Sequence, residues 1–248
     1  MRSATAVSET PQQMSQADTQ DIDDFIYLMS HDVRASIRAL LELPQWIVED
    51  LEDAGVDLSG PVANSIEMMN RHTARLDRML VDLLAYSRVG RMQQVSEVDV
   101  NACLDDVLSS LPIPEGMTLT RDIGCSHVHM GEQDALMLWN TLISNSIKHH
   151  HKAASGSISV SAQTEGTMVR FTVIDDGPGI PEKFYAKALG AMTTLRPRDE
   201  VEGTGMGLAN ARKIATHYGG SISLSDTAGA KSGLRVDLVM PHGIEAAE

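Results

Sequence analysis

The 248-residue sequence is poor in cysteine, in aromatic residues and in positive charge. Two cysteines, Cys103 and Cys125, are too few for a disulfide framework and lack metal-ligand spacing, which favours a reducing compartment. Aromatic residues make up 4% of the chain, so the core must be built from Leu, Ile, Val and Met. The chain has 20 basic and 34 acidic residues, and the net charge of −14 argues against nucleic acid as a partner.

Long apolar runs are missing as well. No window reaches the roughly 18 to 20 apolar residues of a membrane span, and the first ten residues lack the apolar core of a secretory signal. We therefore expect a cytoplasmic protein without membrane contact.

The N-terminal third predicts a tail followed by a helical hairpin. Residues 1–20 are rich in Ser, Thr, Gln, Ala and Asp, the composition of a disordered tail. Apolar residues then recur three and four apart, which indicates two helices of a hairpin over 21–91. The seam positions are Ile26, Met29, Val33, Ser36, Leu40, Leu43 and Ile47, then Val62, Ile66, Met69, Thr73, Leu76, Leu80, Leu83 and Ser87. Since two helices cannot cover all their apolar faces, we expect a homodimeric four-helix bundle.

The rest of the chain predicts an α+β domain. A polar linker over 92–97 separates the hairpin from residues 98–248, which mix helical and strand patterns. The runs NACLDDVLSSL, GEQDALMLWNTLISNSIKHH and MGLANARKIATHYGG read as helices. The runs MTLTRDI, HVHM, SISVSAQ, MVRFTVID, SISLS and LRVDLVM read as strands, with a hairpin turn at Gly166.

His31, in the run SHDVR, is the first candidate for chemistry. At about 100° per residue it is turned roughly 160 to 200° away from Met29 and Val33, so its ring is expected to be exposed. Asp32 can accept a hydrogen bond from one ring nitrogen and leave the other with a lone pair for attack. Taken alone, the pattern is more often that of a surface histidine on a charged helix.

A second group lies on one face of a predicted helix. Asn145, Lys148 and His149 fall at i, i+3 and i+4, and Thr141 joins them one turn earlier. An amide oxygen suits a Mg²⁺ ion carried by phosphates, and an ammonium suits the same phosphate oxygens. An ordinary polar helix face remains the alternative. The run of three histidines at 149–151 does not predict a metal site, because consecutive helical residues point about 100° apart.

Two glycine-rich segments complete the candidates. DDGPGIP follows a strand; Asp175 could accept a hydrogen bond from an exocyclic amine, and Gly177 and Gly179 could admit a flat ring such as adenine. The run EGTGMGL opens a helix, where backbone N–H groups could hold phosphates. Taken singly, the first segment could be a tight turn, and the second is neither a Walker loop nor a Rossmann fingerprint.

In this order, SHDVR, NTLISNSIKHH, DDGPGIP and EGTGMGLANARKIATHYGG resemble the H, N, G1 and G2 boxes of two-component sensor histidine kinases. The resemblance covers about residues 22–241. It implies a dimerisation and histidine phosphotransfer hairpin, followed by the ATPase fold shared with gyrase and MutL, a layer of helices on a mixed sheet. The polar segment before the first helix is too short for a sensory domain, so we expect a separate sensor protein to dock on the hairpin.

The same resemblance assigns roles to individual residues. His31 corresponds to the phospho-accepting histidine, Asp32 to the acidic residue that assists its deprotonation, and Asn145 to the Mg²⁺ ligand. Residues 192–202 correspond to a mobile ATP lid. Nucleotide binding is assigned to Asn145, Lys148, His149, Asp175, Gly177, Gly179, Gly203, Thr204, Gly205, Met206, Gly207 and Leu208.

The implied activity is an autokinase that uses ATP and Mg²⁺ and passes the phosphoryl group from His31 to an aspartate on the receiver domain of a response regulator. Five residues depart from the family pattern. Ala35 lies where many such kinases carry the Thr or Asn used for dephosphorylating the regulator, which weakens the expectation of phosphatase activity. Ser36 replaces a proline, so the kink of the first helix is absent or moved to Pro44. Thr141 replaces an asparagine, and Leu189 and Met192 replace the lid phenylalanines.

Two other functions are compatible with parts of the pattern. A phosphotransfer relay would keep the bundle with His31 and would have lost ATP binding, but the Asn145, Asp175 and glycine segments argue against this. A Ser/Thr kinase or an ATPase of the same fold would use the hairpin for interaction only, and an exposed SHDVR argues against that.

Overall fold

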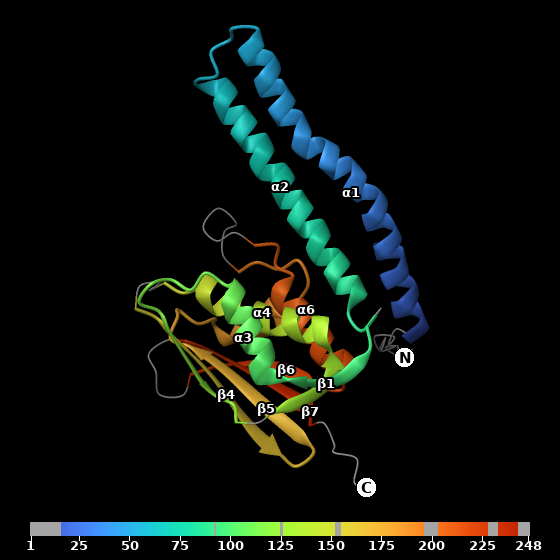
Figure 1. The fold of residues 1–248 in the computed structure, drawn as a ribbon, viewed down its shortest axis with the longest axis vertical. Coiled ribbons are helices and arrows are strands. Elements are labelled where there is room, and N and C mark those ends of the chain that lie inside the picture. The colour runs from blue at the N-terminus through green and yellow to red at the C-terminus, as the bar shows by residue number, and fades with distance from the viewer. Residues whose placement is uncertain are drawn as a thin grey trace, which may run out of the picture.

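Two long helices extend from a domain built on a mixed β-sheet (Figure 1). This computed structural model describes residues 16–91, 93–124, 126–151, 155–195, 203–227 and 233–242, with side chains from Val33 onward. In these residues no helix is both long enough and apolar enough to cross a bilayer.

The hairpin consists of α1 (Gln16–Asp53) and α2 (Pro61–Arg88). Gly55 and Gly60, at φ of 68° and 64°, frame the turn, and Pro61 opens α2 where its missing N–H costs no hydrogen bond. The start of α1 corrects our expectation, because residues 16–20, expected in the tail, are helical. Asp18, in the first turn of α1, favours this extension, since negative charge near a helix N-terminus is stabilising.

The packing between α1 and α2 differs from the predicted seam. The helices meet through Ile37 and Leu41 on α1 and through Leu80 and Leu84 on α2. Most of the predicted seam instead faces outward, because a single neighbouring helix covers only a narrow stripe of each helix. The outward stripe comprises Val33, Leu40, Leu43, Ile47, Val62, Met69 and Leu76, each 39–48% exposed.

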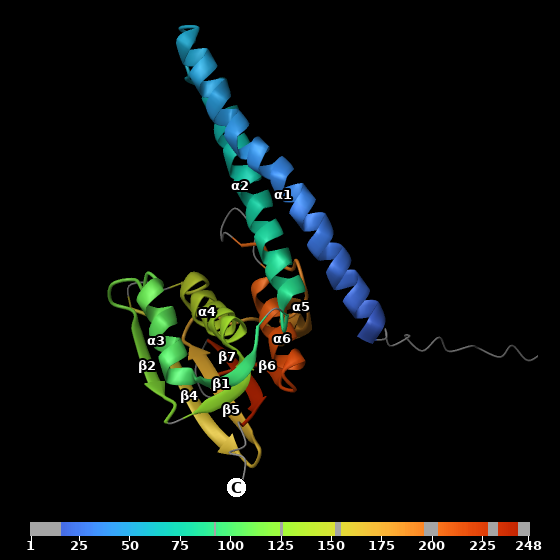
Figure 2. The same cartoon turned by 45° about the vertical axis from the view of Figure 1, so that its right-hand side comes forward.

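The curvature of α1 has an identifiable cause. Pro44 lies inside the helix, where its ring removes one backbone hydrogen bond and crowds the carbonyl of Leu40. Figures 1 and 2 show that the two helices separate toward the end that carries the N-terminus of α1. Pro44 is the position to which one of our two alternatives assigned the kink.

The second domain follows the predicted order of elements, with three additions. Its helices are α3 (Val100–Ser110), α4 (Glu132–Lys148) and α6 (Gly207–His217). Its strands are β2 (Thr118–Asp122), β3 (His127–Gly131), β4 (Ser157–Glu165), β5 (Met168–Asp175), β6 (Ser221–Asp226) and β7 (Leu234–Pro241). The additions are β1 (Val95–Asp99), the 3-10 turn η1 (Glu182–Phe184) and α5 (Tyr185–Ala188).

The strand β1 corrects the predicted linker at 92–97. It pairs antiparallel with β3, and of its five residues only Val98 is buried. A strand with so little buried surface carries no alternating apolar signal, because its backbone pairing rather than its side chains holds it in place.

The main sheet has the order β2-β4-β5-β7-β6. The β2–β4 pair is parallel and the other pairs are antiparallel, so the sheet is mixed, as expected. The β4–β5 hairpin turns at Gly166, whose φ is 64°. The helices α3, α4 and α6 lie over one face of this sheet (Figure 2).

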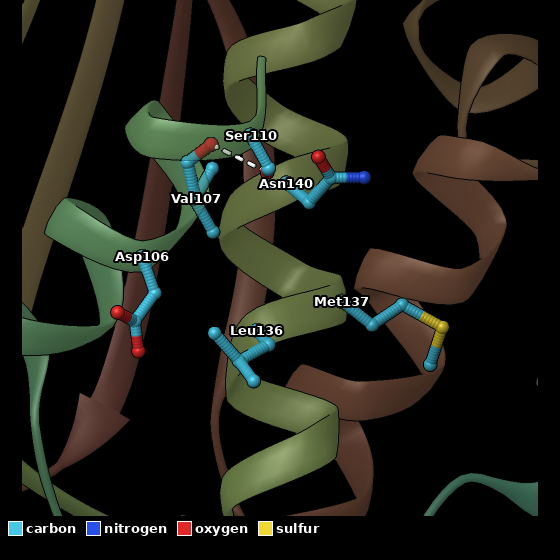
Figure 3. Close-up of a pocket in the computed structure, with 6 residues that line it drawn as sticks. All are labelled: Asp106, Val107, Ser110, Leu136, Met137 and Asn140. Atoms are coloured by element: carbon cyan, nitrogen blue, oxygen red, sulfur yellow. Dashed lines mark hydrogen bonds between the residues drawn. The ribbon is translucent and has the colours of Figure 1, made fainter.

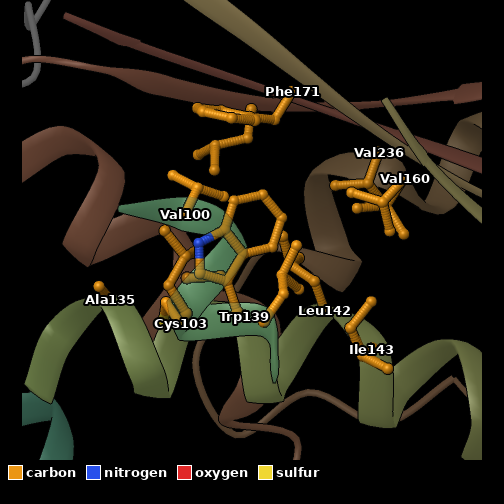
Figure 4. Packing of buried hydrophobic residues seen from close by; sticks show 14 of the residues in the cluster. Val100, Cys103, Ala135, Trp139, Leu142, Ile143, Val160, Phe171 and Val236 are labelled. Atoms are coloured by element: carbon orange, nitrogen blue, oxygen red, sulfur yellow. The ribbon is translucent and has the colours of Figure 1, made fainter. Parts of the chain in front are cut away.

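The core lies between these helices and the sheet (Figure 4). Trp139 on α4 meets Phe171 on β5 edge to face, with ring centroids 5.2 Å apart. Cys103 is buried beside them, and burial, with the charges of Asp106 and Glu132, raises the pKa of its thiol to about 12. Cys103 is therefore a packing residue, whereas Cys125 lies outside the described residues.

Polar contacts join the hairpin to this domain at the end of α2. The carboxylate of Asp134, 3% exposed, accepts hydrogen bonds from Gly90 N at 2.8 Å and from the Tyr218 hydroxyl at 2.7 Å. Nζ of Lys213 on α6 lies 4.1 Å from the ring centroid of Tyr86 on α2, a cation–π contact. These contacts orient α6 and its N-terminus beneath the hairpin.

Candidate nucleotide-binding site

The predicted face of α4 meets the start of α6. A Cβ built on Gly207, the first residue of α6, would lie 3.3 Å from Cγ2 of Thr141 and 3.4 Å from Nδ2 of Asn145. Residues 62 positions apart along the chain therefore come together, because α4 and α6 pack side by side over the sheet. The half-buried Asn145 side chain thus reaches the N-terminus of a helix, where backbone N–H groups favour anions.

Lys148 joins the same place from the last turn of α4. Its Nζ would lie 3.4 Å from a Cβ built on Gly203, in the segment that leads into α6. Glycine at 203 and 207 therefore keeps side-chain volume away from Lys148 and Asn145. The arrangement leaves an ammonium, an amide and free helix N–H groups within one region, which suits a polyphosphate and its cation.

Asp175 ends β5 and is 7% exposed. Its Oδ1 accepts hydrogen bonds from Gly177 N at 2.9 Å and from Leu234 N at 3.4 Å. Burial raises the pKa of this carboxyl, and these two donors, the Ser146 hydroxyl and the charge of His150 oppose the rise. A buried acceptor held by so many donors has a fixed direction, as reading an exocyclic amine requires.

Two of the predicted glycines serve the packing of loops. Gly179, at φ of 69°, lies so close to Gly233 that an added Cβ would sit 2.6 Å from its carbonyl oxygen. Gly205, at φ of 76°, lies equally close to Thr193, whose N–H donates to the Gly205 carbonyl at 3.2 Å. Both positions therefore require glycine for backbone contact within the protein.

The side chains of three further predicted residues lie in the core or on the surface. Met206 is 1% exposed and Leu208 packs against the core, so either residue would meet a ligand through its backbone. His149 is exposed at the C-cap of α4. The sequence pattern did not distinguish these side chains from ligand-facing ones, because all lie within the same short segments.

The predicted phosphorylation site lies in the N-terminal half of α1. His31 and Asp32 are helical, but their side chains lie outside the part of the chain for which side chains are described. The predicted lid begins at Met192, whose φ is 56°, and its residues 196–202 also lie outside the described ranges.

Asp82 on α2 makes a contact that the sequence did not indicate. Its carboxylate accepts a hydrogen bond from the Thr204 hydroxyl, between residues 122 positions apart. The same hydroxyl accepts a hydrogen bond from Met206 N at 3.3 Å. A side chain of the hairpin thus contacts the segment predicted to hold phosphates, and no local pattern in α2 marks this position.

A shallow groove between α3 and α4 is separate from these residues (Figure 3). It is lined by Asp106, Val107, Ser110, Leu136, Met137 and Asn140. It contains none of the predicted nucleotide-binding residues, and it lies on another face of α4 than Asn145.

The residues present fit ATP with a magnesium ion. Gly203 and Gly207 leave room that a Cβ would fill, and Asn145 offers an amide oxygen there. Within the described ranges no three His, Cys, Asp or Glu side chains gather as a metal site. A single amide ligand is what a Mg²⁺ ion needs when phosphates and water supply the rest of its shell.

Comparison with known proteins agrees with this geometry. Residues 132–243 match the family of histidine kinase-, DNA gyrase B- and HSP90-like ATPases. Cyanobacterial phytochrome B of Nostoc sp. (strain PCC 7120 / SAG 25.82 / UTEX 2576) is 28% identical over 223 residues, 86% of this chain and 29% of that protein. The methanogenesis regulatory histidine kinase FilI of Methanothrix harundinacea (strain 6Ac) is 26% identical over 220 residues, 86% of this chain and 24% of FilI.

The chain is therefore similar to sensor histidine kinases over most of its length, and residues 132–243 match the ATPase family that histidine kinases share with DNA gyrase B and HSP90. It spans about a quarter of the length of these curated relatives. In fold it is similar to full-length ShkA in complex with AMPPNP, with a TM-score of 0.66 and 19% identity over 91% of this chain and 47% of ShkA. It is also similar to histidine kinase ThkA in complex with response regulator TrrA, with a TM-score of 0.57 and 17% identity over 91% of this chain and 64% of ThkA.

Proposed function

We propose that this protein is an ATP-dependent histidine autokinase that phosphorylates His31 and passes the phosphoryl group to an aspartate of a response regulator. The observation that carries the proposal is the meeting of Asn145 and Lys148 with Gly203 and Gly207. These residues come from two of the four predicted boxes, and only the fold brings them together.

Each part of the site has a task in this proposal. Asp175 accepts a hydrogen bond from the exocyclic amine of adenine, beside Gly177. The N-terminus of α6 and Lys148 hold the phosphates. Asn145 would hold Mg²⁺, which would supply positive charge against the phosphate oxygens. The ATP-binding domain therefore supplies position and charge, which account for most of the catalysis of phosphoryl transfer.

The proposed transfer has two steps. In the first, a ring nitrogen of His31 bonds to the γ-phosphorus, the bond from that phosphorus to the β–γ bridging oxygen breaks, and ADP leaves. Asp32 accepts the ring proton. In the second, a carboxylate oxygen of the regulator bonds to the phosphorus, the nitrogen–phosphorus bond breaks, and His31 regains a proton.

Incubation with γ-labelled ATP and Mg²⁺ tests this proposal. Label that is lost in acid and kept in base identifies a phosphorylated histidine. Label stable in acid would identify a Ser/Thr kinase instead, and ATP hydrolysis without protein label would identify an ATPase. A phosphotransfer relay would neither bind ATP nor become labelled by it.

The proposal also includes the protein's partners and its location in the cell. The complex of ThkA with TrrA supports a response regulator as the phosphoryl acceptor, since this chain shares the fold of ThkA. A cytoplasmic location fits the requirement for ATP and the free thiol of Cys103. The separate sensor protein stays a prediction.

We also place a homodimer in the proposal, and Leu76 tests it. Leu76 is 48% exposed on the outward stripe of the hairpin, where a second copy would cover it. Leu76→Glu is expected to weaken the dimer by about 100-fold, because two carboxylates would be buried without partners. Light scattering after gel filtration measures the mass. Val81→Glu, about 140° around α2, is the matched control and should remain a dimer. A monomeric wild type would overturn the prediction.

Asp82 offers a test at the phosphate end of the site. Its carboxylate holds Thr204 and adds negative charge where a triphosphate would bind. Asp82→Ala is therefore expected to tighten ATP binding about fivefold, close to 1 kcal/mol of removed repulsion. Titration calorimetry measures the Kd. Glu67→Ala, which removes the same charge about 22 Å along α2, should change nothing. Equal or weaker binding by the Asp82 variant would contradict the prediction.

A further inference from the structure

His150 lies at the junction of three elements that surround Asp175. It follows the C-cap of α4, and its side chain is fully buried. Nε2 lies 2.8 Å from Oδ1 of Asp176, the residue directly after β5. The same Oδ1 accepts a hydrogen bond from Ser157 N, at the start of β4, at 2.6 Å. His150 therefore links the end of α4 to the ends of β4 and β5.

The direction of the hydrogen bond between His150 and Asp176 follows from the state of the acid. The bond from Ser157 N, with the His150 ring, lowers the pKa of Asp176 to about 2. Asp176 is therefore ionised at neutral pH and can only accept. Nε2 of His150 must carry the proton and donate it, which fixes the orientation of the ring.

Gly156 makes the space for this ring, and Gly177 lies in contact distance of it. A Cβ on Gly156 would lie 2.5 Å from Cε1 of His150, so any other residue there would displace the ring. On its other side, Cδ2 lies 3.5 Å from the place of a Cβ on Gly177. Gly177 is the residue whose N–H holds Asp175 at 2.9 Å. The ring is thus enclosed between the start of β4 and the turn that fixes Asp175.

We infer that His150 is a positioning residue for adenine recognition, which holds the turn 175–177 so that the carboxylate of Asp175 faces the exocyclic amine of the base. This inference rests on the proposed function. It adds a specificity role for a buried histidine that would not touch the nucleotide. The run of three histidines thus contains one residue with a defined task, and that task is not metal binding.

ATP and ITP, which differ at position 6 of the base and in the proton on N1, test this role. ITP carries a carbonyl oxygen where ATP carries the amine, so the ratio of their dissociation constants measures how well Asp175 is placed. We expect wild type to prefer ATP by at least about tenfold. His150→Phe keeps a flat ring and removes the donor, and it should lower that preference below about threefold, mainly by weakening ATP binding.

Conservative and matched variants make the result specific. His150→Gln supplies an amide donor near the position of Nε2 and should restore most of the preference for ATP. His127→Phe, on β3, changes a half-exposed histidine whose Nδ1 lies 4.0 Å from Glu97, and it should leave the preference unchanged. Thermal unfolding without nucleotide shows whether each variant is folded.

The outcomes separate this inference from the proposed function. If wild type does not prefer ATP over ITP, the proposed reading of adenine by Asp175 fails. If wild type prefers ATP and folded His150→Phe keeps the same preference, or loses ATP and ITP binding equally, the positioning role fails while the proposed function stands.

Discussion

Replacing Asp175 with Asn is expected to weaken ATP binding by about 100-fold, or roughly 2.7 kcal/mol. Three donors, Gly177 N, Leu234 N and the Ser146 hydroxyl, converge on the buried carboxylate. An amide would turn its own N–H groups toward one of these donors and would remove the charge that the amine of adenine meets. Titration calorimetry with ATP measures the effect.

The control for Asp175→Asn is the same substitution at an aspartate outside the candidate site. Asp226→Asn alters an aspartate at the end of β6 that accepts a hydrogen bond from the Tyr185 hydroxyl at 2.6 Å. This variant should bind ATP as wild type does. If Asp175→Asn, shown to be folded by its circular dichroism, also binds ATP like wild type, adenine is not read by Asp175.

The second large effect is expected at Asn145. Asn145→Ala removes the only amide on α4 that lies against Gly207, and the rate of His31 labelling should fall by about 10²–10³-fold. The physical reason is loss of a Mg²⁺ ligand where charge develops during transfer. Labelling rates are measured over a series of Mg²⁺ concentrations.

A neighbouring asparagine provides the comparison for Asn145. Asn140→Ala changes an exposed amide on the same helix, in the α3–α4 groove, and should retain the wild-type labelling rate. Asn145→Asp keeps an oxygen ligand and should recover part of the rate at raised Mg²⁺. A normal rate for Asn145→Ala, with the same Mg²⁺ dependence as wild type, would remove Asn145 from metal binding.

The sequence predicted elements whose side chains alternate between core and solvent. The strand β5 has the predicted bounds, and α4 ends two residues earlier than the predicted run. Both present strong apolar patterns, because each buries a face against the same core around Trp139 and Phe171. The segment β1 has no such pattern, and its pairing with β3 could be found only in the fold.

The residues of the candidate site divide in the same way, into those that a local sequence pattern predicted and those that only the fold revealed. Asn145, Lys148, Asp175 and the glycines could be named because each group lies within a short run with a recognisable arrangement. Asp82 and His150 could not, since their roles depend on contacts with Thr204 and Asp176, which are 122 and 26 positions away. Long-range contacts of single side chains leave no period or motif in a sequence.

Wild-type protein and His31→Gln, compared with γ-labelled ATP, test the central claim most directly. The account predicts an acid-labile, base-stable label on wild type and none on His31→Gln, although both proteins bind ATP with the same affinity. Equal binding matters because it shows that the variant lost the acceptor and kept the ATP-binding domain. Label that persists on His31→Gln, or a wild type that binds ATP and Mg²⁺ without ever being labelled, would contradict the claim.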